Sequence, residues 1–197
     1  MKIISKILVP ILMIVSFSAQ AESGDVGLVF ELGLHAGGDE VTRASTTTGE
    51  ETVTAGGGIS AAIGAGFDIT DDMSMQLTFG FKDDSINGSN GNISFSRDTL
   101  DLLFHSKLTD SVSLGAGVTA HTNVKLTSDG VGAFYVQDTD FENAYGALLD
   151  AKFDVGDPGK FFLALRLTFI EYETTQNNLA KKTFSGNSLG LIWGGRF

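Results

Sequence analysis

Apolar side chains recur at every second position along eight segments of the chain, most of them about ten residues long. The segments cover residues 27–36, 59–68, 75–82, 100–105, 112–121, 145–154, 161–169 and 189–197. Successive side chains of a β-strand point to opposite faces, so a period of two indicates strands with two different faces. Strands of about ten residues can cross a bilayer at a tilt. The pattern therefore predicts eight membrane-crossing strands.

The links between these segments alternate between short and long. The short links are "ITDDMSM" at 69–75, "LTDSVSL" at 108–114 and "VGDPGK" at 155–160, where Asp and Thr side chains can bond their own backbone. Longer polar links lie near 37–54, 83–92, 127–140 and 173–187. Three short turns and four long loops fit an antiparallel barrel with an even number of strands and both ends on one side. Pro158 lies in a turn, as a closed barrel requires.

The two faces of the segments separate a membrane barrel from a soluble one. One row is bulky and apolar on all eight segments, which suits lipid. The other row is largely Gly, Ser, Thr and Ala with about one charge per strand, whereas a water-exposed exterior carries dense Lys and Glu. Small residues suit the narrow interior of a small barrel. We therefore expect an all-β fold, a closed eight-stranded antiparallel transmembrane β-barrel; a soluble lipocalin-like barrel is the alternative.

The first 21 residues have the features of a signal peptide. Lys2 and Lys6 provide a positive start, "ILVPILMIVSFS" at 7–18 is apolar, and "AQA" at 19–21 is a small-x-small cleavage site. The alternative is a membrane anchor, but the apolar stretch is shorter than the ~20 residues of a spanning helix. We expect residues 1–21 to be a cleaved signal peptide and residues 22–197 to form the barrel.

Charge and composition exclude several classes of protein. The formal net charge is −11, and removal of Lys2 and Lys6 would change it to −13 (11 basic against 24 acidic residues), so nucleic acid is not an expected partner. The chain has no cysteine, which excludes a disulfide framework and thiolate metal sites.

The last segment, "SLGLIWGGRF", has apolar alternate positions and ends on an aromatic residue. Together with the signal peptide, the "TD" turns and the eight alternating segments, it resembles the small outer-membrane β-barrel proteins of Gram-negative bacteria, the OmpX, OmpW and OmpA-barrel class. The resemblance covers the chain after residue 21 and implies export through the periplasm to the outer membrane. It also implies outer-membrane lipid, lipopolysaccharide and the barrel-assembly machinery as partners, and we expect a monomer. In that class the terminal strand is the assembly signal, which here would comprise Leu189, Leu191, Trp193 and Phe197. A simpler reading is that Phe197 anchors the strand at the membrane interface, and both roles can hold together.

Ionisable residues occur in the row that should face the lumen. They are Glu31, His35, Lys82, Asp101, His105, His121, Asp150, Lys152 and Arg166. Eight strands enclose an interior just wide enough for side chains, and buried charges need partners. We expect a charge network that plugs the lumen, formed by these residues apart from His35; a narrow solute path is the alternative.

The hairpin around Pro158 gives a testable register. If Val155 pairs with Phe161, Asp150 lies opposite Arg166 and both point into the lumen, with Cβ atoms about 5 Å apart. Glu31 and Asp101 are the next acids expected to reach Arg166.

Candidate chemistry elsewhere is weak. Outer-membrane lipid A deacylases use a His and a Ser, but the adjacent residues His105 and Ser106 should point to opposite faces. The acidic tracts in the loops could bind divalent cations together with the lipopolysaccharide phosphates that these cations bridge. Solvated acidic loops are the simpler interpretation. We expect no catalytic, cofactor-binding or metal-binding residues. The sequence favours a structural or surface-interaction protein; a narrow channel for small solutes and a lipid A-modifying enzyme are the alternatives.

Overall fold

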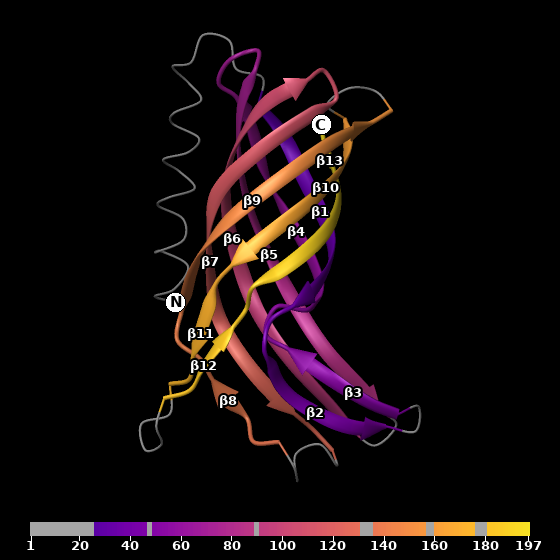
Figure 1. Cartoon of the computed structure of the whole chain (residues 1–197), viewed down its shortest axis with the longest axis vertical. Helices are drawn as coiled ribbons and strands as arrows, with labels where there is room; N and C mark the ends of the chain where they lie inside the picture. The colour runs from indigo at the N-terminus through magenta and orange to yellow at the C-terminus, as the bar shows by residue number, and fades with distance from the viewer. Residues whose placement is uncertain (1–25, 47–48, 89–90, 131–135, 157–159, 176–180) are drawn as a thin grey trace, which may run out of the picture.

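The computed structural model describes residues 26–46, 49–88, 91–130, 136–156, 160–175 and 181–197. Within them, eight antiparallel strands form a barrel, which is closed because β6 also pairs with β7 (Figure 1). The barrel strands are β1 (Val26–Gly37), β4 (Gly58–Asp68), β5 (Met73–Gly88), β6 (Gly91–Thr109), β7 (Val112–Ser128), β9 (Ala144–Val155), β10 (Phe161–Phe169) and β13 (Ser188–Arg196). The predicted fold class and strand number are confirmed. The expected signal peptide, residues 1–21, lies outside the described residues.

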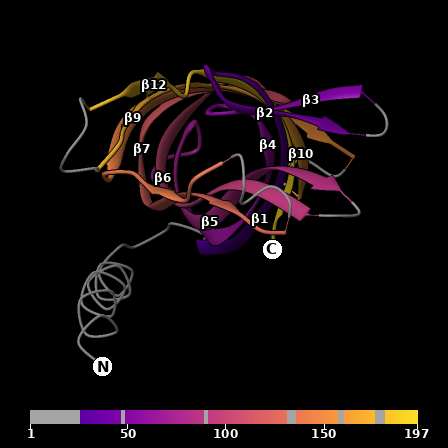
Figure 2. The ribbon, with the colours of Figure 1, turned by 90° about the horizontal axis from the view of Figure 1, so that it is seen from below.

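Short turns lie at one end of the barrel and longer extensions at the other (Figure 1). The extensions carry the hairpins β2 (Glu40–Thr46) with β3 (Gly49–Thr54) and β11 (Glu171–Glu173) with β12 (Thr183–Ser185), and β8 (Thr139–Asp140), which pairs with β7. Seen along the barrel from that end, they surround its opening (Figure 2). We call the two ends the turn end and the hairpin end.

The exterior carries a band of exposed apolar side chains. It includes Leu28, Leu32, Leu34, Ile59, Ile63, Phe79, Phe81, Leu100, Phe104, Leu114, Val118, Leu149, Phe153, Leu163, Leu165, Leu167, Leu189, Leu191 and Trp193. Each of these belongs to the apolar row of its strand, and the intervening residues face the lumen, as the alternation predicts. Such a band is the lipid-facing surface of a transmembrane barrel. The described residues contain no helix that is both long and apolar enough to cross a membrane.

Beyond the band, towards the hairpin end, the roles of the two faces are exchanged. On β6 the outward side chains change from Leu100 to Asp98 and Ser96, whereas the inward ones become Phe95 and Ile93, which are buried. Water replaces lipid outside, so the polar row faces outward and the apolar row packs inside. The segment 83–92 was expected to be a loop; that expectation was wrong, because β5 and β6 continue through it and pair as far as Gly88 and Gly91.

A β-bulge on β7 maintains this arrangement. Asn123 is an extra residue opposite β6 and has a positive φ of 51°. Its side chain donates to Asp98 Oδ2 at 2.6 Å. The extra residue moves the inward row from odd to even positions, so Val124 and Leu126 are buried.

The chain ends on the outer surface at the turn end. Phe197 and Leu28 exchange two backbone hydrogen bonds, of 2.6 and 2.9 Å. The Phe197 ring stacks on Phe30 at 5.9 Å and meets Phe161 edge-on at 5.6 Å, and Trp193 stacks on Phe161 at 6.3 Å. The terminal residue therefore belongs to an aromatic group that joins β1, β10 and β13.

Candidate functional site

One arginine in the lumen contacts carboxylates from three other strands. Arg166 on β10 forms a bidentate pair with Glu31 on β1, with Nη1–Oε2 at 3.0 Å and Nη2–Oε1 at 2.9 Å. Its Nη2 also donates to Asp150 Oδ2 on β9 at 3.0 Å, and its Nη1 to Asp101 Oδ2 on β6 at 3.4 Å. Arg166, Glu31 and Asp150 are each 4% exposed. We call these four residues the arginine cluster; its paired charges lie where water cannot screen them.

The register of the β9–β10 hairpin produces this contact. Val155 pairs with Phe161, and Asp150 lies opposite Arg166, so the predicted register is confirmed. The expected approach of Glu31 and Asp101 to Arg166 is confirmed as well. The turn therefore sets the depth of both charges in the barrel.

Further polar side chains extend the cluster towards the turn end. His105 Nε2 lies 3.4 Å from Asp150 Oδ2. Gln76 donates to Glu31 Oε1 at 2.7 Å and accepts from Lys152 Nζ at 3.3 Å. Lys152 thus reaches the cluster through an amide rather than through a carboxylate.

Glycines on neighbouring strands make room for the lumenal imidazoles. A Cβ at Gly115 would come within 2.5 Å of His105 Cδ2, and a Cβ at Gly190 within 2.6 Å of His35 Nδ1. His35 in turn lies 2.8 Å from Ser60 Oγ through Nε2. Glycines of the inward row therefore leave room for the larger polar side chains of the neighbouring strands.

Two buried cations face each other nearer the hairpin end. Lys82 on β5 pairs in register with Arg97 on β6. Lys82 Nζ donates to Ser188 Oγ at 3.3 Å. Arg97 donates to the backbone carbonyls of Phe95 and Gly57 at 3.0 and 2.9 Å, and its guanidinium lies 4.8 Å from the Phe95 ring centroid. Backbone oxygens and an aromatic face therefore accommodate the guanidinium.

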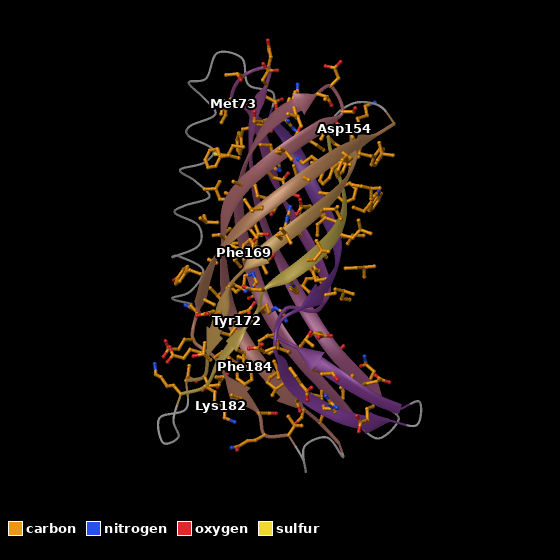
Figure 3. All side chains as sticks on the ribbon, in the orientation of Figure 1. Met73, Asp154, Phe169, Tyr172, Lys182 and Phe184 are labelled. Atoms are coloured by element: carbon orange, nitrogen blue, oxygen red, sulfur yellow. The ribbon has the colours of Figure 1, made fainter. Side chains whose placement is uncertain are left out.

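An apolar core follows at the hairpin end. It consists of Val53, Ala55, Ile86, Ile93, Phe95, Val124, Leu126, Phe141, Ala144, Ile170 and Tyr172, with Phe184 and three smaller side chains packed against it. The Tyr172 hydroxyl lies 2.6 Å from His121 Nδ1, which ties this core to the barrel wall. Figure 3 labels Tyr172 and Phe184 between Phe169 and the hairpin end. We call this group the upper core, although it lies in the lower part of the view in Figures 1 and 3. It packs the inside of the barrel beyond the arginine cluster.

The opposite half of the lumen is hollow. A cavity of about 700 Å³ extends from the turn end into the barrel. Asp71 and Lys107 line it at the exposed turns, while Gln76, Phe162 and Val29 are its buried wall. The lumen therefore has three parts along its axis, the cavity, the arginine cluster and the upper core.

Side-chain and backbone bonds hold the hairpins together outside the band. Asp39 exchanges two bonds with Ser185, at 2.7 and 2.8 Å, and Asp84 accepts from Thr54. Lys181 pairs with Glu142 at 2.9 Å, and that hydrogen bond raises the pKa of Lys181 above its ordinary value. The hairpin end is therefore a bonded surface rather than a set of separate loops.

The structure places the predicted lumenal residues at several depths. It brings together Glu31, Asp101, Asp150 and Arg166 with His105 and, through Gln76, Lys152, while Lys82 and His121 lie towards the upper core. The sequence reasoning missed Gln76, Arg97 and Tyr172. Arg97 shares the inward row of β6 with Asp101 and His105. Extending this row towards the N-terminus of the strand would have included Arg97. Tyr172 lies in β11, just after the segment predicted to end at residue 169 and just before the link expected near 173–187.

His105 and Ser106 point to opposite faces: His105 is buried and Ser106 is exposed, as predicted. Over the described ranges, no three His, Cys, Asp or Glu side chains are grouped so that they could hold a metal ion.

The comparisons with known proteins give a fold. No protein-family model and no curated sequence matches the chain. Among solved structures, Neisserial surface protein A (NspA) is 14% identical, with 89% of this chain and 100% of that one covered and a TM-score of 0.50. Ail, the attachment invasion locus protein of Yersinia pestis, is 11% identical, with 90% and 100% covered and a TM-score of 0.51. Another structure shows Ail in complex with the heparin analogue sucrose octasulfate, at 11% identity, 89% and 100% coverage and a TM-score of 0.50.

The chain therefore has the fold of the small eight-stranded outer-membrane β-barrel proteins. With the exposed apolar band, this fold assigns it to the outer membrane.

Proposed function

We propose that this protein is a surface-interaction protein whose barrel is a closed support for its hairpin end. The observation that carries the proposal is the blocked lumen: the arginine cluster and the upper core occupy successive levels inside the barrel. A solute crossing the barrel would have to separate Arg166 from three carboxylates and then part an apolar core. Short turns face the periplasm and long connections the exterior in outer-membrane barrels, so the hairpin end is the surface offered to partners.

The charge of the hairpin end favours a basic partner. Acidic side chains there are Asp39, Glu40, Glu50, Glu51, Asp83, Asp84, Asp98, Asp129, Asp138, Asp140, Glu142, Glu171 and Glu173, against the exposed bases Arg43, Lys125, Lys181 and Lys182. Ail was solved with a polyanionic heparin analogue. An acidic rim would repel such a ligand. We infer that this protein instead contacts basic surfaces or, through divalent cations, lipopolysaccharide phosphates.

Several further roles belong to the same proposal. Residues 1–21 would direct export and be removed, leaving residues 22–197 as the mature barrel. Leu189, Leu191, Trp193 and Phe197 would form the signal read by the assembly machinery. The protein would act as a monomer.

Complementation of a deletion strain tests the proposed role. The wild-type gene, a variant with residues 45–50 replaced by a short Gly-Ser turn that leaves Val53 of the upper core in place, and an Asp101→Asn variant would be compared for envelope phenotype and lipid A composition. We expect the phenotype to be restored by Asp101→Asn but not by the truncated hairpin, with lipid A unchanged throughout. Restoration by the truncated hairpin, or lipid A that changes with the gene, would contradict the proposal.

A further inference from the structure

The hollow half of the lumen contains a lysine whose charge has no close counter-ion. Lys152 lines the cavity, with its ammonium 3.3 Å from Gln76 Oε1 and 4.6 Å from the Phe162 ring centroid. In the described part of the chain, no carboxylate lies within ion-pair distance of Lys152. The other two cations of the cavity have oxygen partners: Arg196 pairs with Asp68 at 2.6 Å, and Lys107 donates to the Asp71 carbonyl at 2.6 Å.

Most residues that line the cavity are polar or charged, among them Asp68, Asp71 and Asp154, but the wall also includes two buried apolar side chains. Phe162 and Val29 are 3% and 1% exposed, and Ser113 lies opposite Lys152 on β7. Small-molecule sites combine apolar surface with polar groups at fixed positions; here Phe162 and Val29 provide apolar surface and Lys152 a charge, and a volume of about 700 Å³ is within the usual range of such sites. A partly buried ammonium attracts an anion more strongly than an exposed one, because the surroundings screen it less.

Asp154 limits the charge of the ligand. It follows Lys152 by two positions on β9, faces the same cavity, and is labelled at the turn end in Figure 3. A dianion at Lys152 would be repelled by this carboxylate, whereas a single negative charge would be matched by the ammonium.

We propose that the turn-side cavity binds small monocarboxylates with a compact apolar body, entering from the periplasmic end. The carboxylate lies at the Lys152 ammonium and the apolar body packs against Phe162 and Val29. Gln76 lines the cavity and donates to Glu31 of the arginine cluster, which lies further along the barrel, so binding does not require passage through the barrel. The site is independent of the proposed role of the hairpin end.

Titration of the folded protein in lipid nanodiscs tests this site. Phenylacetate is the probe and phenylacetamide its neutral match, and backbone amide shifts are followed by nuclear magnetic resonance. We expect saturable shifts at Ser113, Lys152 and Phe162 with phenylacetate, and binding at least about tenfold weaker for phenylacetamide, the value of one charge-assisted hydrogen bond.

Matched variants separate the site from non-specific uptake into the membrane. Lys152→Met should weaken phenylacetate binding by about tenfold or more, whereas Lys125→Met, at the hairpin end, should leave it unchanged. Ser113→Leu places a larger apolar side chain opposite Lys152 and should weaken binding even if Lys152→Met folds poorly. Shifts that do not saturate, equal affinity for the two probes, or equal binding by Lys152→Met and wild type would overturn the proposal.

Discussion

Arg166 shows how a single lumenal residue depends on its neighbours. Its guanidinium contacts three carboxylates in a space where no residue of the cluster is more than slightly exposed. Burial of a charge is tolerated only when the charge is paired, and removal of one partner leaves the others uncompensated. The cluster should therefore behave as a unit.

Replacement of Arg166 by alanine should destabilise the barrel by about 3–5 kcal/mol, the cost of breaking a buried ion pair. Asp150→Ala combined with Arg166→Ala should cost less than the sum of the two single changes, because their side chains touch. Urea unfolding of detergent-refolded protein, followed by gel mobility, measures the full cycle. Strict additivity would show that the contact contributes nothing to stability.

Gly115→Ala should displace His105 from Asp150, because the new Cβ would lie 2.5 Å from the imidazole. The expected cost is about 1–3 kcal/mol, as for other overpacked interiors. In a His105→Ala background the same change should cost much less. Gly88→Ala, near a hairpin tip, serves as the matched control. A cost independent of His105 would mean that Gly115 acts through the backbone instead.

At the scale of the elements, the strands in the membrane were predictable and those beyond it were not. The β9–β10 register followed from one turn, since Val155 and Phe161 both face lipid. Segment 83–92 was mistaken for a loop because its outward side chains, such as Asp83 and Ser85, are polar. Outside the bilayer a polar outward row is what water requires, so the alternation continues with its faces exchanged. Arg97 was missed because its neighbours Ser96 and Asp98, which point outward, are polar, so the strand was expected to begin only at residue 100.

Deletion of Phe197 should lower the amount of folded barrel in the outer membrane more than it lowers synthesis. The deletion removes the two backbone bonds to Leu28 and the stacking on Phe30 that close the seam between β1 and β13. Phe197→Tyr keeps both and is the control. Cell fractionation with heat-modifiable gel migration measures the outcome. Equal folded material in the deletion and the control would count against an assembly role for the terminus.

The whole molecule combines a lipid-facing band, a three-part lumen and an acidic hairpin end. The barrel and its inward charges could be predicted because a period of two fixes which residues share a face. The order of cavity, cluster and upper core along the axis could not, because it depends on strand stagger and on the bulge at Asn123. The acidic rim depends on hairpins that appeared as polar links in the sequence. Function at this scale therefore depends on whether the lumen is closed.

Single-channel recording of the refolded wild-type protein in planar bilayers tests that closure most directly, with a porin in the same bilayers as positive control. We expect no resolved conductance steps from folded, heat-modifiable protein, because the arginine cluster and the upper core block the lumen at two successive levels. Reproducible steps that scale with the amount of folded protein would contradict it and would favour a narrow channel.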